Sequence, residues 1–160
     1  MLIAFFESIK YVGHLFPVAL LRVYVGSYYL NQAISHYGSD FLSQPRLAEA
    51  AMHWAPRSLA PEWYKWLIQQ ILVPNWFAFS YGVWVSEIII AISFILGYFV
   101  RPTCVLGMAL TLNFVAIYGP ENKDLHWLFF VIFLTLAWLG AGRCLGLDYY
   151  YYKRRRGLWW

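Results

Sequence analysis

Glu87 is the only charged residue between Trp76 and Val100, a run that is otherwise apolar or neutral. A carboxylate in such surroundings needs a partner, because an unpaired charge in hydrocarbon costs at least about 2.5–3.5 kcal/mol. Arg22 and Asn113 stand in two other apolar stretches. Arginine can bind a carboxylate through two parallel hydrogen bonds. We therefore predict that Arg22 and Glu87 pair.

These polar residues also have the chemistry to bind a quinone, whose two carbonyl oxygens need donors and whose reduction needs protons. Arginine, asparagine and tyrosine side chains can donate, a carboxylate can relay a proton, and aromatic rings can flank the head group. The candidate catalytic residues are Glu87 and Arg22, and the candidate quinone-binding residues are Arg22, Tyr28, Tyr29, Trp84, Glu87 and Asn113. Two other interpretations stay open: the pair is a structural staple that fixes helix register, or Glu87 is an unpaired proton carrier.

The composition indicates what kind of element positions these residues. The chain has 160 residues, of which 61% are hydrophobic and only 12% charged. Soluble domains are about half apolar and about a quarter charged. Nine tryptophans and thirteen tyrosines fit aromatic belts at the two surfaces of a bilayer. We predict an all-α integral membrane protein, a single domain over residues 1–160 that forms a four-transmembrane-helix bundle with amphipathic interfacial helices.

Apolar runs give the expected boundaries. A span of about 20 residues crosses the hydrocarbon core, and four runs qualify, at about 15–36, 75–99, 102–118 and 125–142. An interfacial helix is expected at 2–12 and a turn, GPENKD, at 119–124. The outer loop 37–73 contains two further candidate helices, at 43–54 with Ser43 as its cap and at 60–72. We favour surface-lying helices there over re-entrant segments.

The distribution of positive residues predicts the orientation. With four spans, one side holds Lys10, Arg101, Arg143 and the basic run 153–156. The other side holds fewer, namely Arg46, Arg57, Lys65 and Lys123. Positive residues prefer the cytoplasmic side, so both termini and the basic tail 149–160 are expected there. The predicted location is the cytoplasmic (inner) membrane of a bacterium or archaeon, in a multi-pass topology. No nucleic-acid partner is expected, because the basic run directly follows an apolar helix.

Histidine and cysteine offer weaker signals. His36 and His126 stand at the outer ends of the first and fourth spans, where two histidines could hold a haem. We favour ordinary interfacial hydrogen bonds for both. Cys104 and Cys144 match no zinc-binding spacing, and we expect reduced thiols. No metal site is predicted.

Three segments resemble the DoxX family of membrane proteins. They are LLRVYVGSYYLNQAISHY in the first span, SEIIIAISFILGYFVRPTCVLGMAL across the second and third, and GAGRCLGLDYYY after the fourth. Family members have four membrane helices and include the DoxD subunit of thiosulfate:quinone oxidoreductase. The resemblance implies that the residues matching the family pattern are Arg22, Gly26, Glu87, Arg101, Gly142, Arg143 and Asp148.

The resemblance implies a membrane subunit of a quinone-linked oxidoreductase, with thiosulfate as a candidate electron donor and quinone as the cofactor. The chain has no nucleotide-binding fingerprint, P-loop or cluster of metal ligands. A catalytic role would therefore need redox groups from a partner, or a bound quinone. Two alternatives stay open. One is a non-catalytic accessory or scaffold subunit, bound to other membrane or periplasmic subunits through the tryptophan-rich outer loop and the basic tail. The other is a small-molecule carrier.

Overall fold

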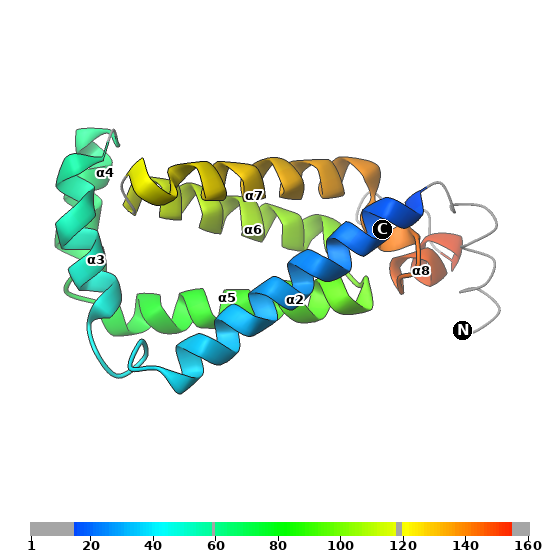
Figure 1. Ribbon diagram of the computed structural model, residues 1–160, viewed down its shortest axis with the longest axis horizontal. Coiled ribbons are helices and arrows are strands. Elements are labelled where there is room, and N and C mark those ends of the chain that lie inside the picture. Colours follow the sequence, from blue (N-terminus) through cyan, green and yellow to red (C-terminus); the bar gives the residue numbers. More distant parts are fainter. Residues whose placement is uncertain (1–14, 59, 118–119, 155–160) are drawn as a thin grey trace.

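Four long helices pack side by side along most of the molecule (Figure 1). The computed structural model describes residues 15–58, 60–117 and 120–154, and its regular elements in these ranges are all helical. The all-α prediction is therefore confirmed for this part of the chain, whereas the interfacial helix predicted at 2–12 lies outside it. The four long helices are α2 (Phe16–Gly38), α5 (Trp76–Leu96), α6 (Val100–Ile117) and α7 (Pro120–Leu139).

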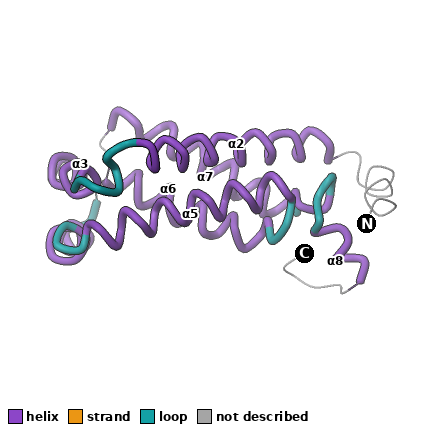
Figure 2. Tube along the Cα trace, turned by 90° about the horizontal axis from the view of Figure 1, so that it is seen from below, coloured by secondary structure: helices purple, strands orange, loops and turns teal. Residues whose placement is uncertain are grey.

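Two of these helices, α5 and α6, are long and apolar enough to cross a membrane. Figure 2 shows all four long helices running lengthwise, with the shorter elements gathered at the two ends.

The helix boundaries differ from the predicted ones near prolines and glycines. Helix α7 begins at Pro120, so the predicted turn at 119–124 is wrong over most of its length. Proline suits a first helical position, because the N–H that it lacks would have no partner there. The same helix ends at Leu139 rather than 142, because Gly140 adopts a left-handed conformation with φ +62°.

Short helices cover the end of the long ones where the predicted outer loop lies, and this end is called the outer end below (Figure 1). Both helices predicted in the outer loop are present, as α3 (Arg46–Trp54) with the 3₁₀ turn η2 (Ala55–Arg57), and as α4 (Glu62–Leu67) continued by the π-helical turn η3 (Ile68–Leu72). The predicted cap is wrong: Pro45 precedes α3, and the Ser43 hydroxyl instead donates to the Asp40 carbonyl at 3.4 Å. These elements bury a second apolar cluster that is separate from the main core and includes Leu47, Ala51, Ile68, Leu72 and Ile117.

The main core lies between the four long helices. Val25 of α2, Ile90 and Phe94 of α5, and Phe133 and Leu136 of α7 are fully buried there. Helix α6 contributes Cys104 and Val100. At Gly26 the backbones of α2 and α5 approach so closely that an added Cβ would lie 2.9 Å from Cβ of Phe94. This close approach fixes how far α2 can slide along α5.

At the opposite end, called the inner end below, the chain after α7 folds back against the turn between α5 and α6. The turn η4 (Ala141–Arg143) leads to α8 (Asp148–Arg154). The Asp148 carboxylate accepts the backbone N–H of Phe99 at 2.8 Å and of Val100 at 3.2 Å. Burial raises the pKa of Asp148, while these two hydrogen bonds and Arg22 act in the opposite direction. The carboxylate thus holds the two loops together.

Gly142 leaves no room for a side chain at this junction. An added Cβ would collide with Oδ2 of Asp148. We expect Gly142→Ala to lower the free energy of unfolding by about 1–3 kcal/mol, the usual cost of forcing an extra methyl into a packed site. Thermal unfolding in detergent, followed by circular dichroism, measures this loss. The matched control is Gly82→Ala on α5, where an added Cβ meets nothing within 4 Å. A Gly142→Ala protein as stable as the control would contradict this close packing.

Candidate functional site

Glu87 pairs with a histidine. The Oε2 atom of Glu87 lies 2.8 Å from Nδ1 of His36, and the side chains of Glu87 and His36 are 3% and 22% exposed. The imidazole also stacks on the ring of Phe41, with centroids 4.0 Å apart and planes 15° from parallel. The carboxylate is therefore neither unpaired nor paired with Arg22. The predicted Arg22–Glu87 pair and the unpaired proton carrier are both wrong.

Arg22 is occupied at the inner end of the bundle. Its Nη1 donates to the carbonyls of Ala141 at 2.9 Å and Cys144 at 3.1 Å, and its Nη2 donates to the carbonyl of Leu145 at 3.0 Å. The residue is 1% exposed. A guanidinium has donors in a fixed planar fork, which suits three carbonyl groups of one tight turn. Arg22 therefore closes the turn after α7.

Helix register explains why the two charges do not meet. Arg22 and His36 are about 14 residues apart on α2, which is roughly 21 Å along the helix axis. The antiparallel packing of α2 on α5 sets Arg22 beside Gly97, at the end of α5. It sets Ala33 beside Trp84, whose Nε1 donates to the Ala33 carbonyl at 3.0 Å. Glu87 lies one helical turn from Trp84 and is therefore near the His36 end of α2.

The remaining candidate residues fall in three different places. Tyr29 is 4% exposed and packs against α7, with its ring centroid 5.7 Å from that of Phe133. Tyr28 also contacts α7, with its ring 4.7 Å from that of Phe129. Asn113 lies elsewhere, towards the outer end of α6. The structure thus groups Trp84 with Glu87 in the outer half of the α2–α5 pair but does not gather all six candidates into one site.

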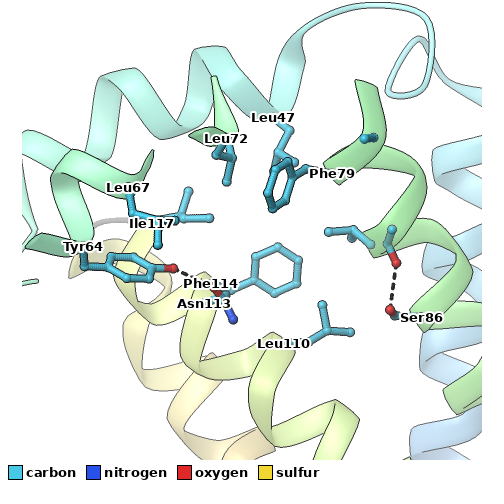
Figure 3. A pocket seen from close by; sticks show the side chains of 13 residues that line it. Leu47, Tyr64, Leu67, Leu72, Phe79, Ser86, Leu110, Asn113, Phe114 and Ile117 are labelled. Atoms are coloured by element: carbon cyan, nitrogen blue, oxygen red, sulfur yellow. Dashed lines mark hydrogen bonds between the residues drawn. The ribbon is translucent and has the colours of Figure 1, made fainter. Parts of the chain in front are cut away.

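A cavity of about 420 Å³ lies at the outer end, between the outer halves of α5 and α6 and under the short helices (Figure 3). Its walls are mostly apolar, with Phe79 from α5 and Phe114 from α6 among them. The residues that line it are Leu47, Tyr64, Leu67, Leu72, Ala78, Phe79, Gly82, Val83, Ser86, Leu110, Asn113, Phe114 and Ile117. Known small-molecule pockets hold about 300–1,000 Å³, so this volume suits a small ligand.

A few polar groups face this cavity. The Tyr64 hydroxyl of α4 donates to Oδ1 of Asn113 at 2.6 Å (Figure 3). Nδ2 of Asn113 donates to the Ala109 carbonyl at 2.7 Å. Burial raises the pKa of the Tyr64 phenol, so the hydroxyl keeps its proton at neutral pH. The Ser86 hydroxyl donates to the Gly82 carbonyl at 2.7 Å. The cavity therefore combines an apolar wall with a hydroxyl and an amide that could each rotate towards a ligand oxygen.

The histidine and cysteine residues that the sequence singles out have separate surroundings in the structure. The ring of His126 lies 5.3 Å from that of Phe114, centroid to centroid, whereas Nδ1 of His36 contacts Glu87. Cys104 and Cys144 are buried free thiols. Within 15–58, 60–117 and 120–154, the structure places no three histidine, cysteine or acidic side chains where they could share a metal ion.

No family model, no curated protein and no solved structure matches this chain. The resemblance to the DoxX family therefore depends on its short motifs. Three of the motif residues, Arg22, Gly142 and Asp148, lie together at the inner junction.

Sequence reasoning does not find His36 as the partner of Glu87, nor Tyr64 as a cavity residue. A usable signal exists for His36, because it continues the buried stripe of Arg22, Gly26, Tyr29 and Ala33 at helical spacing. A histidine in line with buried residues is a candidate partner for a buried carboxylate. Tyr64 has no comparable signal, since it is one of several aromatic residues on a short helix of the outer loop.

Proposed function

We propose that this chain is a four-span membrane subunit of a quinone-linked oxidoreductase, resembling the DoxX family, and that it binds the quinone head group in the outer cavity. The membrane part of the proposal is supported by the outward faces of the four long helices. Each carries large apolar side chains that are half exposed or more, with Tyr24 on α2, Ile92 on α5, Val105 on α6 and Trp138 on α7 as examples. A soluble protein rarely exposes such continuous apolar surface.

The spacing of these exposed residues fits lipid contact. On α5, Val85, Ile89, Ile92 and Leu96 follow at intervals of three or four residues and are all exposed. The opposite face of the same helix carries the buried residues Ser80, Glu87, Ile90, Ala91, Ser93 and Phe94. A helix with a polar, buried inner face and an apolar outer face is typical of a membrane bundle. The 18 to 23 residues of the four long helices also suit a core about 30 Å thick.

The cavity is the observation that carries the quinone proposal. It joins an apolar wall to the Tyr64–Asn113 pair, and a quinone joins an apolar ring and tail to two carbonyl oxygens. Tyr64 and Asn113 would hold a quinone oxygen by donating hydrogen bonds, and Phe79 and Phe114 would flank the ring. A bound quinone supplies two-electron redox chemistry, with electrons delivered by a partner subunit and ultimately by a reduced donor such as thiosulfate.

Filling the cavity should prevent quinone binding without harming the fold. Gly82 lines the cavity, and an added Cβ there meets nothing within 4 Å. We expect Gly82→Leu to weaken binding of a short-chain ubiquinone analogue more than tenfold, because the leucine side chain occupies the space of the ring. Tyr64→Phe should weaken binding about two- to tenfold, the range for one neutral hydrogen bond. Quenching of tryptophan fluorescence in detergent micelles measures both constants.

Val85→Leu is the matched control, since Val85 lies on the outward face of the same helix and is 45% exposed. This variant should bind the analogue as the wild type does. Equal binding by the wild type and Gly82→Leu would show that the quinone is not in this cavity. A wild type that binds no quinone analogue at all would overturn the quinone proposal while leaving the membrane proposal standing.

A second candidate function is an accessory or scaffold subunit of a larger membrane redox complex. It is favoured by Trp63 and Trp66 on α4, which are 66% and 60% exposed on the outer cap. Exposed tryptophans are common at the centre of protein interfaces. Co-purification of stoichiometric large subunits with a chain that binds no quinone would favour this second candidate.

A further inference from the structure

Helix α2 carries a row of polar side chains on its outward face. Ser27, Asn31 and Ser35 follow one another at four-residue intervals, and all three residues are exposed. The buried residues of the same helix, which include Arg22 and Tyr29, lie on its opposite side. Figure 2 shows α2 along one side of the bundle, so the polar row faces away from the other long helices.

The hydrogen bonds of this row are incomplete. The Ser27 hydroxyl donates to a carbonyl one turn earlier in its own helix at 3.0 Å, as the exposed Thr135 hydroxyl does on α7 at 2.8 Å. Within residues 15–58, 60–117 and 120–154, by contrast, the Asn31 amide and the Ser35 hydroxyl have no hydrogen bond. The outward face of α5 differs, because its exposed residues are aliphatic over the same length. The polar row is therefore a feature of α2 that contact with lipid alone does not explain.

The depth of Asn31 makes this arrangement unfavourable for a chain alone in a bilayer. Asn31 precedes the end of α2 at Gly38 by seven residues, so it lies about 10 Å inside the helix. Moving an amide without a partner from water into hydrocarbon is unfavourable. In membrane proteins such side chains form hydrogen bonds to a neighbouring helix, and small residues beside them allow the two backbones to approach. The row thus indicates a helix–helix interface on the outward face of α2.

The chemistry of the row favours a second copy of this chain as the neighbour. Copies in one membrane share one orientation, so two α2 helices that meet run parallel, and residues near the two-fold axis face their own copies. Each side chain in the row must then be able to bind itself. Two asparagine amides can exchange a pair of hydrogen bonds, and a serine hydroxyl both donates and accepts. Charged side chains would instead repel their copies, and the row consists only of Ser27, Asn31 and Ser35.

We propose that the row Ser27, Asn31 and Ser35 forms the interface between two copies of this chain, with Asn31 paired across the two-fold axis. The interface depends on the proposed membrane embedding but not on the quinone cavity, which lies between α5 and α6. Helix α2 is then covered on both sides. Gly26 packs it against α5 of its own bundle, and Asn31 binds it to the second copy.

Fluorescence resonance energy transfer between two labelled populations of the full chain tests this interface in phosphatidylcholine liposomes. Increasing the lipid-to-protein ratio gives the dissociation constant of the dimer. Asn31→Leu should weaken dimerisation about tenfold to a hundredfold, the range for two interhelical hydrogen bonds. Asn31→Gln should lie between this variant and the wild type, because it keeps the amide on a longer side chain. Asn31 is exposed, so neither change disturbs the packing of its own bundle.

The matched control is Thr135→Leu, which removes an exposed hydroxyl that is already hydrogen-bonded within α7 and should leave dimerisation unchanged. In the same liposomes, Asn31→Cys should form an oxidised dimer readily, whereas Val85→Cys on the outward face of α5 should not. An inserted wild type that is monomeric at every dilution would overturn this proposal alone, as would equal dissociation of wild type and Asn31→Leu.

Resistance of the liposome-bound chain to alkaline carbonate distinguishes this result from a failure of the membrane proposal. A chain that carbonate washes off would overturn the membrane embedding and the interface together. In native membranes, cross-linking of Asn31→Cys to a different membrane protein, with no oxidised dimer, would assign the row to a partner subunit and overturn the second-copy proposal. Because Gly82→Leu leaves α2 intact, the quinone test and the dimer test give independent results.

Discussion

Replacing Arg22 by methionine should destabilise the protein far more than replacing an exposed arginine. The guanidinium satisfies the carbonyls of Ala141, Cys144 and Leu145 in a turn shielded from water. Methionine fills similar volume but donates no hydrogen bond, so three carbonyl groups lose their charged donor. Hydrogen bonds to charged groups are each worth about 1.5–3 kcal/mol, and loss of the buried charge offsets part of this. We expect Arg22→Met to lower the free energy of unfolding by about 3–5 kcal/mol in detergent micelles titrated with a denaturing detergent.

Two comparisons separate this effect from a general loss of charge. Arg46→Met removes an arginine whose side chain is 52% exposed and which forms an ion pair with Asp40. An exposed pair contributes about 0–1 kcal/mol, so this variant should unfold close to the wild type. Arg22→Lys should fall between the two, because one ammonium group cannot reach three carbonyls as a planar fork does. If Arg22→Met and Arg46→Met unfold at the same denaturant concentration, Arg22 does not hold the turn together.

The backbone around this turn shows why the interaction matters. Leu145 and Phe99 have left-handed φ values of 51° and 56°, which cost energy for residues with a Cβ. Arg22 binds the carbonyl of Leu145, and Asp148 binds the N–H of Phe99. The two unfavourable conformations are thus each fixed by a buried charged side chain. Arg22 and Asp148 therefore stabilise the strained backbone of the inner junction.

The long helices can be predicted from sequence because each is a run of apolar residues with a clear length. Their ends are harder to place. A glycine followed by Pro120 indicates a stop signal, whereas Pro120 is the first residue of α7. Proline is compatible with both roles, and only packing against α6 decides between them. The second short helix of the outer loop is predictable because its tryptophans and aliphatic residues recur on one side at helical spacing. The first is also predictable as a helix, although its cap is not.

The partners of the buried charges cannot be predicted in the same way. Glu87 and Arg22 are opposite charges in two apolar stretches, and pairing them is the natural inference from sequence. Arg22 instead binds backbone carbonyl groups. Every residue has such a group, so no residue type in the sequence indicates which ones Arg22 binds. The position of those carbonyls depends on the fold of the turn after α7, including the left-handed Gly140. The relative sliding of α2 and α5 is likewise set by the close contact at Gly26.

His36 and Glu87 should be coupled in stability, and this is the second large effect that we expect. His36→Phe keeps the ring stacked on Phe41 but removes the contact to Glu87, whose side chain is 3% exposed. The buried carboxyl group then has no partner, which should lower the free energy of unfolding by about 3–5 kcal/mol, the range for breaking a buried pair. Adding Glu87→Leu should restore much of that loss, because the double variant leaves no buried charge without a partner. The coupling energy from this double-mutant cycle should be about 1–3 kcal/mol.

A second cycle distinguishes this pair from the one that the sequence alone suggests. Arg22 and Glu87 have separate partners, in the inner turn and on the outer part of α2. Effects of distant sites without shared partners add to within about 0.5 kcal/mol. Arg22→Met should therefore cost the same in the wild type and in a Glu87→Leu background, measured by the same denaturing titration. Strong coupling in this cycle, together with none between His36 and Glu87, would mean that Glu87 is paired with Arg22 after all and that α2 packs on α5 in a different register.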